Sequence, residues 1–205
     1  MPGRDTYHHG DLRRAIITVA IDVISTDGTA AISLRDLARR AGVSHAAPAH
    51  HFGDKAGLLT AIAVEGYEFL ADSLQDALNS TPLPVVELGV RYVSFAAEHP
   101  AHFEVMYRPD LYHRDDPELL AAKNWTRRVL RAGVAGAPSD AHDTGDTIVE
   151  ADALAAWSMA HGFATLLRTG NFEEFLDDTT PIELFRRLAR RAAPFRDLAD
   201  DRPTT

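Results

Sequence analysis

A glycine turn of three residues, Gly42-Val43-Ser44, separates two short segments that both have the pattern of a helix. Residues 33–41 place leucine and alanine side chains on one helical face, and Ser33 and Asp36 have the spacing of a capping box. A second short helix is expected over residues 44–51, with its first residue as the N-cap. Two short helices joined by a short turn that contains glycine form a helix-turn-helix unit. This stretch therefore limits the possible folds of the chain more than any other.

The segments on both sides of this unit also have the pattern of helices. Residues 12–26 carry aliphatic side chains at helical spacing, and Gly28 is a suitable stop signal. Asp54 can cap a long helix whose apolar positions continue to about Asn79. The unit is therefore expected to lie between one helix before it and a long helix that leads into the rest of the chain.

The rest of the chain is also predicted to be helical. Prolines divide it into segments with helical periodicity, over residues 84–98, 101–108, 115–135, 147–169 and 181–193. The sequence shows no alternation typical of strands. We therefore predict an all-α protein with an N-terminal three-helix helix-turn-helix domain over residues 1–56 and a helical C-terminal domain over residues 57–205.

The two predicted domains differ in charge. The chain has a formal net charge of −9, with histidine counted as neutral. Residues 1–56 hold seven Lys and Arg against six Asp and Glu, a net +1, together with five of the ten histidines, so residues 57–205 carry −10. A nearly neutral, histidine-rich domain can approach a polyanion, whereas an acidic domain is repelled by it. The two domains are therefore expected to bind different partners.

Cysteine and long apolar segments are both absent from the sequence. The lack of Cys excludes disulfides, thiolate metal sites and cysteine nucleophiles, and it fits a reducing compartment. The longest apolar run near the N-terminus, "AIITVAI", ends at Asp22 and is far shorter than the roughly 20 residues of a membrane span. We therefore expect a cytoplasmic protein with no membrane partner.

Three histidines, His45, His50 and His51, lie in or beside the second short helix. A metal site needs ligands on one helical face at spacings of three or four residues, but these histidines are adjacent or five residues apart. The adjacency of Ser44 and His45 does not supply the geometry of a nucleophile and its base. We therefore predict no metal, cofactor or catalytic residue here, which leaves a phosphate backbone or solvent as the surroundings of the histidines.

The stretch "SLRDLARRAGVSHAAPAHHFGDKAGLL" (33–59) resembles the DNA-binding head of tetracycline-repressor-like (TetR) transcription regulators. The resemblance implies contacts with a DNA duplex from Ser33, Arg35, His50, His51 and Lys55 at the phosphates, and from Ser44, His45, Ala46 and Ala47 at base edges or sugars. The family usually has a tyrosine at the position of Ala49, and alanine leaves few groups that can hydrogen-bond to bases. Modest affinity, or contact with thymine methyl groups, is the expected consequence.

Two stretches of the C-terminal domain, "EHPAHFEVMY" (98–107) and "AWSMAHGFATLL" (156–167), resemble the ligand-binding body of a TetR subgroup marked by a tryptophan followed by His-Gly. The resemblance implies a cavity for a small, mostly apolar effector, although an ordinary aromatic core explains the same residues. The candidate lining is Tyr92, Phe95, Phe103, Met106, Trp125, Trp157 and His161. It also implies that the last two helices pair with their copies in a homodimer, with Leu184 and Phe185 in the seam.

Together these expectations describe a transcriptional regulator, in the simplest case a repressor. It would bind a palindromic double-stranded DNA operator as a homodimer and would be released by the effector. Two alternatives remain open. One is a dimeric small-molecule-binding protein with weakened DNA binding, suggested by Ala49. The other is a small helical enzyme that uses His161 and Asp152, although the sequence shows neither a convincing carboxylate pair nor a glycine-rich phosphate loop, and we predict that the chain is not an enzyme.

Overall fold

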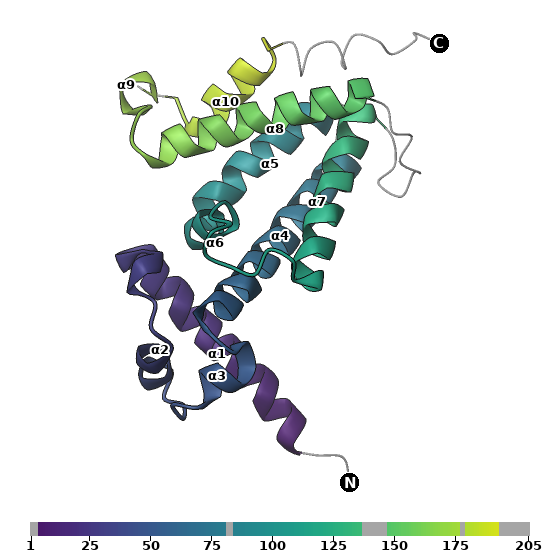
Figure 1. Ribbon diagram of the computed structural model, residues 1–205. Helices are drawn as coiled ribbons and strands as arrows, with labels where there is room; N and C mark the ends of the chain where they lie inside the picture. The colour runs from purple at the N-terminus through teal and green to yellow at the C-terminus, as the bar shows by residue number, and fades with distance from the viewer. Residues whose placement is uncertain (1–3, 81–83, 137–146, 177–178, 193–205) are drawn as a thin grey trace. The chain divides into compact units, whose positions relative to one another are not determined.

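The computed structural model describes residues 4–80, 84–136, 147–176 and 179–192, and all regular structure in these ranges is helical (Figure 1), which confirms the predicted all-α class. In chain order the elements are α1 (Arg4–Asp27), the 3-10 helix η1 (Thr29–Ala31), α2 (Leu34–Arg40), α3 (Ala47–Phe52), α4 (Lys55–Ser80), α5 (Pro84–Glu98), α6 (Pro100–Met106), α7 (Pro117–Ala135), α8 (Thr147–Arg168), α9 (Glu173–Leu176) and α10 (Pro181–Ala189). None of the helices in these ranges combines the length and the apolar character that a bilayer span requires.

Contacts between residues divide the chain into two compact units. The first unit contains residues 1–67 and 99–121, so α6 and the beginning of α7 belong with the N-terminal helices. The second unit contains residues 68–98 and 122–205. α4 contributes its first half to one unit and its second half to the other. The predicted boundary after residue 56 separates two functional domains. Contacts between residues do not test a division by function, so this boundary stays a prediction.

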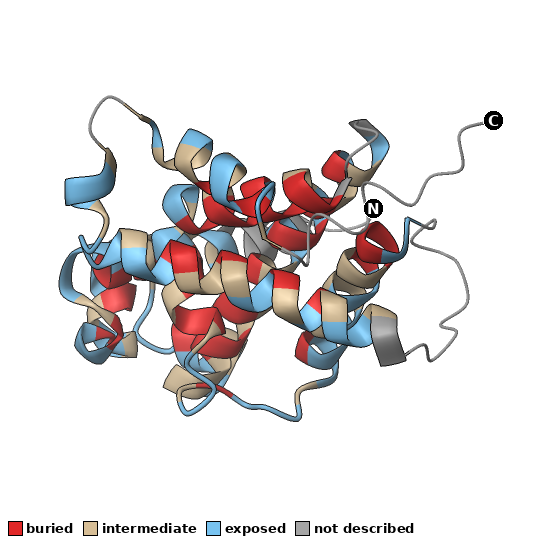
Figure 2. Ribbon diagram, turned by 90° about the horizontal axis from the view of Figure 1, so that it is seen from above, coloured by how far each residue is buried: buried red, intermediate tan, exposed pale blue. Residues whose placement is uncertain are grey.

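The core of the first unit forms along one face of α1. Ile16, Ala20 and Ile24, spaced four residues apart, are almost fully buried, and they belong to one cluster with Leu37 of α2 and Leu58 of α4. Buried residues line the inner faces of the helices in Figure 2. Burying one large aliphatic side chain contributes about 1.5–3 kcal/mol. This cluster therefore fixes α2 against α1 and α4.

The turn between α2 and α3 has the glycine that the sequence predicts. Gly42 has a φ of +68°, a left-handed conformation that costs glycine little. α3 begins at Ala47 with Ala46 as N-cap, although the sequence predicts a start after Ser44. The later start places Pro48 in the first helical turn, where its missing N–H leaves no bond unmade.

The second unit includes α5, α8 and α10, and both of the latter pack against α5. The rings of Phe163 in α8 and Phe185 in α10 lie 5.1 Å apart between centroids, and Phe185 is completely buried. Arg186 of α10 donates two hydrogen bonds to Glu87 of α5, at 3.1 and 3.2 Å. Phe185 lies in the core of its own chain, so the prediction that places it in a dimer seam is wrong. Leu184, the other residue predicted for the seam, is half-buried.

Several helix boundaries differ from the predicted ones. α1 begins eight residues before the predicted start, because residues 4–11 contain no aliphatic side chain and so show no apolar periodicity. η1 and α9 are too short to show any period. α10 ends at Ala189 rather than at residue 193. None of these differences changes the order of the predicted helices.

Candidate functional site

The exposed surface around α3 is small and nearly uncharged. Ser44, His45, Ala46, Ala49 and His50 are exposed, and His51 is half-buried. Ala47 belongs to the buried core of the first unit, so its side chain is not part of this surface, although the TetR resemblance implies a base contact for it. The rings of His50 and His51 lie 5.5 Å apart. The surface therefore offers methyl groups, one hydroxyl and imidazoles to a partner.

The residues predicted to meet phosphate at α2 are accessible. Ser33 and Arg35 are both exposed. Ser33 stands at the N-cap position, but its side chain makes no capping bond, which contradicts the predicted capping box. The carboxylate of Asp36 instead accepts hydrogen bonds from Arg39, at 2.7 Å, and Arg40. These two bonds, the one from Arg39 first, lower the pKa of Asp36.

The junction between α3 and α4 is fixed by a helix cap. Gly53 ends α3 with a φ of +75°, and Oδ1 of Asp54 accepts a hydrogen bond from the Gly57 N–H at 2.8 Å, as the sequence predicts for a cap. That bond lowers the pKa of Asp54, and nearby His113, whose Nε2 lies 3.3 Å from Oδ1, lowers it further. Lys55 follows the cap, and its Nζ donates to the Ala30 carbonyl at 3.4 Å.

Three of the predicted effector residues form a hydrogen-bonded network in the second unit. Trp157 Nε1 donates to the hydroxyl of Tyr92 at 3.2 Å, and this hydroxyl lies 2.9 Å from Nδ1 of His161. Tyr92 comes from α5, and the other two residues come from α8. Tyr92 is buried, whereas Trp157 is 38% exposed and His161 is half-buried. Sequence reasoning names all three residues but does not predict the bonds between them.

The other predicted effector residues are distributed over both units. Phe95 is buried in the second unit, and Trp125 of α7 is half-buried with the guanidinium of Arg128 5.2 Å from its ring centre. Phe103 and Met106 of α6 are buried in the first unit, where the Met106 carbonyl accepts hydrogen bonds from two tyrosine hydroxyls. The predicted effector-binding residues are therefore divided between the two units.

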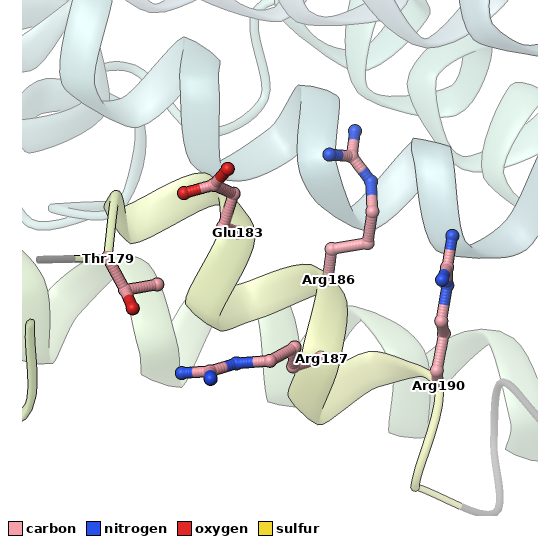
Figure 3. Close-up of a pocket in the computed structure, with 5 residues that line it drawn as sticks. All are labelled: Thr179, Glu183, Arg186, Arg187 and Arg190. Atoms are coloured by element: carbon pink, nitrogen blue, oxygen red, sulfur yellow. The ribbon is translucent and has the colours of Figure 1, made fainter.

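A surface depression of about 390 Å³ lies on α10. It is lined by Thr179, Glu183, Arg186, Arg187 and Arg190 (Figure 3). In this view the side chain of Arg187 extends away from those of Arg186 and Arg190, and Arg186 is already paired with Glu87. Four of the five residues that line this open depression are charged, so it does not match a site for a mostly apolar effector.

Burial of His161 predicts a pH dependence of stability. Desolvation lowers the pKa of His161 below its ordinary value, so the unfolded chain binds this proton more strongly than the folded chain does. Protonation of His161 therefore favours the unfolded chain. The free energy of unfolding is unaffected by this residue above about pH 6.5, and it decreases as the pH falls from there toward the lowered pKa of the folded state. Urea unfolding at pH 7.5 and 5.5 should therefore show a smaller loss of stability on acidification in His161→Leu than in the wild type. Equal losses would contradict the prediction.

The fold and the exposed α3 surface are those of a helix-turn-helix DNA-binding regulator. The family description "Bacterial regulatory proteins, tetR family" matches residues 16–62, and "Tetracyclin repressor-like, C-terminal domain" matches residues 85–192, more than half of the chain. The chain therefore belongs to the TetR family of bacterial regulatory proteins. Members of this family are regulators that bind DNA and are not enzymes, which confirms the predicted class.

Individual proteins are similar to the chain in sequence or in fold. The chain is 32% identical over 101 residues to the HTH-type transcriptional regulator BetI of Rhizobium meliloti (strain 1021), a match that covers 46% of this chain and 50% of that protein. The chain thus spans about half the length of this curated relative. A solved protein of unknown function from Rhodococcus sp. RHA1 is 33% identical, with a TM-score of 0.74 and coverage of 95% of this chain and 98% of the other. PfmR from Thermus thermophilus, a TetR family transcriptional regulator, shares the fold at 22% identity, with a TM-score of 0.62 over 84% of this chain and 93% of the other.

Proposed function

We propose that the chain is a repressor that binds a palindromic DNA operator as a homodimer and releases it when a small, mostly apolar effector binds the second unit. The observation that carries this proposal is the exposed, nearly uncharged surface around α3, which the core of the first unit presents to a partner. A recognition helix places such a surface in the major groove. The proposed DNA contacts are Ser33, Arg35, Ser44, His45, Ala46, His50, His51 and Lys55.

The proposed dimer uses the outer face of α8. Ala151, Leu154, Ser158 and Thr165 are exposed there, and Leu188 of α10 is also exposed. From residue 153 to residue 167 α8 contains no Asp, Glu, Lys or Arg. A side chain added at Gly162 would meet no atom within 4 Å, so packing within the chain does not require glycine at this position. A helix face of small, uncharged side chains fits the close approach of a second copy across a two-fold axis.

The sequence Trp157-x-x-x-His161-Gly162 supports placing the chain in the TetR subgroup with a tryptophan followed by His-Gly. Two residues of this pattern, Trp157 and His161, both hydrogen-bond to the hydroxyl of Tyr92 in α5. Phe95 and Trp125 also belong to the second unit and are the remaining candidates for effector contact there, whereas Phe103 and Met106 belong to the first unit.

The proposed response to effector is a two-state equilibrium. An effector that binds better to the conformation with low DNA affinity weakens DNA binding, and DNA weakens effector binding by the same factor. A mobility-shift assay with DNA from upstream of the chain's own gene tests the proposal. A retarded band that small apolar compounds abolish supports it. Absence of retardation at any DNA concentration would favour a dimeric small-molecule-binding protein, the alternative that Ala49 suggests.

Lys55 at the start of α4 provides a test of the phosphate contacts. Replacing it by alanine should weaken binding to specific and unrelated DNA alike and reduce the slope of log K against log salt by about one phosphate contact. Fluorescence anisotropy over a series of salt concentrations measures both quantities. Lys123→Ala, in α7, is the control and should leave both unchanged. An unaltered salt slope in Lys55→Ala would remove Lys55 from the interface.

A further inference from the structure

Two exposed alanines lie on the outward side of α3. Ala46 and Ala49 are both exposed, and they are three residues apart. Ala46 precedes α3 but already has helical backbone angles, and its carbonyl accepts a hydrogen bond from the His50 N–H at 2.9 Å. Helical spacing therefore applies from Ala46 onward, and residues three apart in a helix share a face. The methyl groups of the two alanines are thus neighbours on the exposed surface.

The buried side of α3 determines which side faces outward. Ala47 and Pro48 are buried, and Ala47 belongs to the same core cluster as Leu37 of α2. Rotation of α3 about its axis would bring these side chains into water, which opposes the rotation. The core of the first unit therefore holds Ala46 and Ala49 on the outer surface.

The stretch from residue 41 to residue 54 lacks the long side chains that read bases. It contains no Arg, Lys, Asn or Gln, the residue types that make bidentate hydrogen bonds to guanine or adenine. Its one carboxylate, that of Asp54, caps α4. Among the groups that a base pair presents in the major groove, the C5-methyl group of thymine is the one that pairs with an apolar side chain. An alanine methyl group at this surface therefore has its partner on thymine.

We propose that Ala46 and Ala49 read two thymines in each half-site of the operator through contacts between methyl groups. Cβ atoms three residues apart in a helix are about 5–6 Å from each other, and successive bases of one strand are about 3.4 Å apart along the duplex axis. The two thymines are therefore neighbours or are separated by a single base pair. The proposal rests on the proposed function, which places α3 in the major groove. It gives Ala49 a role in base recognition that the TetR resemblance does not assign to it.

Deoxyuridine provides the test, because it differs from thymidine only by the missing C5-methyl group and pairs with adenine in the same way. Selection from a pool of randomised synthetic duplexes with the whole chain gives a duplex that binds tightly. Each thymine of this duplex is then replaced by deoxyuridine, one position at a time, and the affinity is measured by fluorescence anisotropy. We expect a loss of about fourfold at two positions in each half-site, as for one methyl-sized group left in water, and no loss elsewhere.

Two glycine variants assign the contacts to individual residues. Ala49→Gly should abolish the difference between thymine and deoxyuridine at one of the two positions, and Ala46→Gly should abolish it at the other. A weaker α3 in either variant lowers the affinity for both duplexes alike, so it does not change the ratio of the two affinities. Ala121→Gly, at an exposed position of α7, is the control and should keep both differences.

Three outcomes overturn the proposal. It fails if the selected duplexes share no thymines, or if deoxyuridine leaves the affinity of the wild-type chain unchanged at every position. It also fails if both glycine variants keep the full difference at both positions. The first two outcomes are measured on the wild-type chain, so they do not depend on the folding of a variant.

These outcomes can be separated from a failure of the proposed function. If a duplex is selected and apolar compounds release it, but deoxyuridine has no effect, the repressor function stands and the thymine contacts fail. If the deoxyuridine effects appear but no compound releases the duplex, the thymine contacts stand and the proposed response to effector fails. If no duplex is retained from the pool, operator binding fails and the thymine contacts fail with it.

Discussion

Replacement of Gly57 by alanine is expected to displace α3 and to reduce operator affinity by at least about tenfold. A Cβ atom at this position would lie 1.9 Å from the carbonyl oxygen of Phe52, the last residue of α3. The obstructing atom belongs to the backbone, so no side-chain rotation relieves the clash. Overpacking of this kind costs about 1–3 kcal/mol, and about 1.4 kcal/mol corresponds to a factor of ten in affinity. Fluorescence anisotropy with an operator duplex measures the loss.

The neighbouring residue offers a matched control for this variant. Ala56→Gly changes the same helical turn without adding an atom, and its cost in helix propensity is at most about 1 kcal/mol. It should leave α3 in place and reduce operator affinity less than Gly57→Ala does. Equal losses in the two variants would show that the clash with Phe52 is not responsible. Light scattering on both variants should give the same mass, because Gly57 is distant in sequence from the proposed dimer face.

Replacement of Leu154 by glutamate is expected to dissociate the homodimer and to abolish tight operator binding. Leu154 is 55% exposed on the outer face of α8. In a two-fold dimer the substitution places two like charges in an apolar contact, and an uncompensated buried charge costs about 3 kcal/mol or more. The dimer dissociation constant should rise at least about a hundredfold. Sedimentation velocity over a range of protein concentrations measures this constant.

Another exposed leucine serves as the control for the dimer prediction. Leu120 in α7 is 43% exposed and belongs to the first unit. Leu120→Glu should leave both the mass and the operator affinity unchanged. Phe185 is unsuitable for this test, because it is fully buried against Phe163 and a charge there would unfold the subunit. A dimeric mass for Leu154→Glu at micromolar concentration would contradict the proposed face.

Short-range sequence patterns predict much of the helix-turn-helix region. The left-handed turn at Gly42 and the cap of α4 by Asp54 both follow from residues within a few positions of each other. The capping box at Ser33 does not form: the Ser33 side chain makes no capping bond, and the carboxylate of Asp36, which would accept from the Ser33 N–H, bonds to arginines three and four residues further along its own helix. Sequence spacing permits both arrangements and does not decide between them.

Contacts between distant segments explain what the sequence does not predict. His113 lies beside Asp54 although they are far apart in the sequence, and no local pattern indicates this contact. Trp157 and His161 are predicted as candidates, but their shared partner Tyr92 comes from another helix. Residues 153–167 of α8 contain no Asp, Glu, Lys or Arg. The outer face of α8 is nevertheless exposed in the single chain, as expected if a second copy covers it.

We expect the bonds between Asp36 and two arginines to affect the affinity of the regulator for random DNA sequence. The single carboxylate of Asp36 offsets one of the two positive charges of Arg39 and Arg40, so the net positive charge that α2 presents to bulk DNA is smaller by one. Affinity for random sequence depends mainly on such cations, whereas discrimination between sites depends on base contacts and DNA shape. A lower affinity for random sequence shortens each unproductive encounter and leaves a larger share of molecules available for the few correct sites.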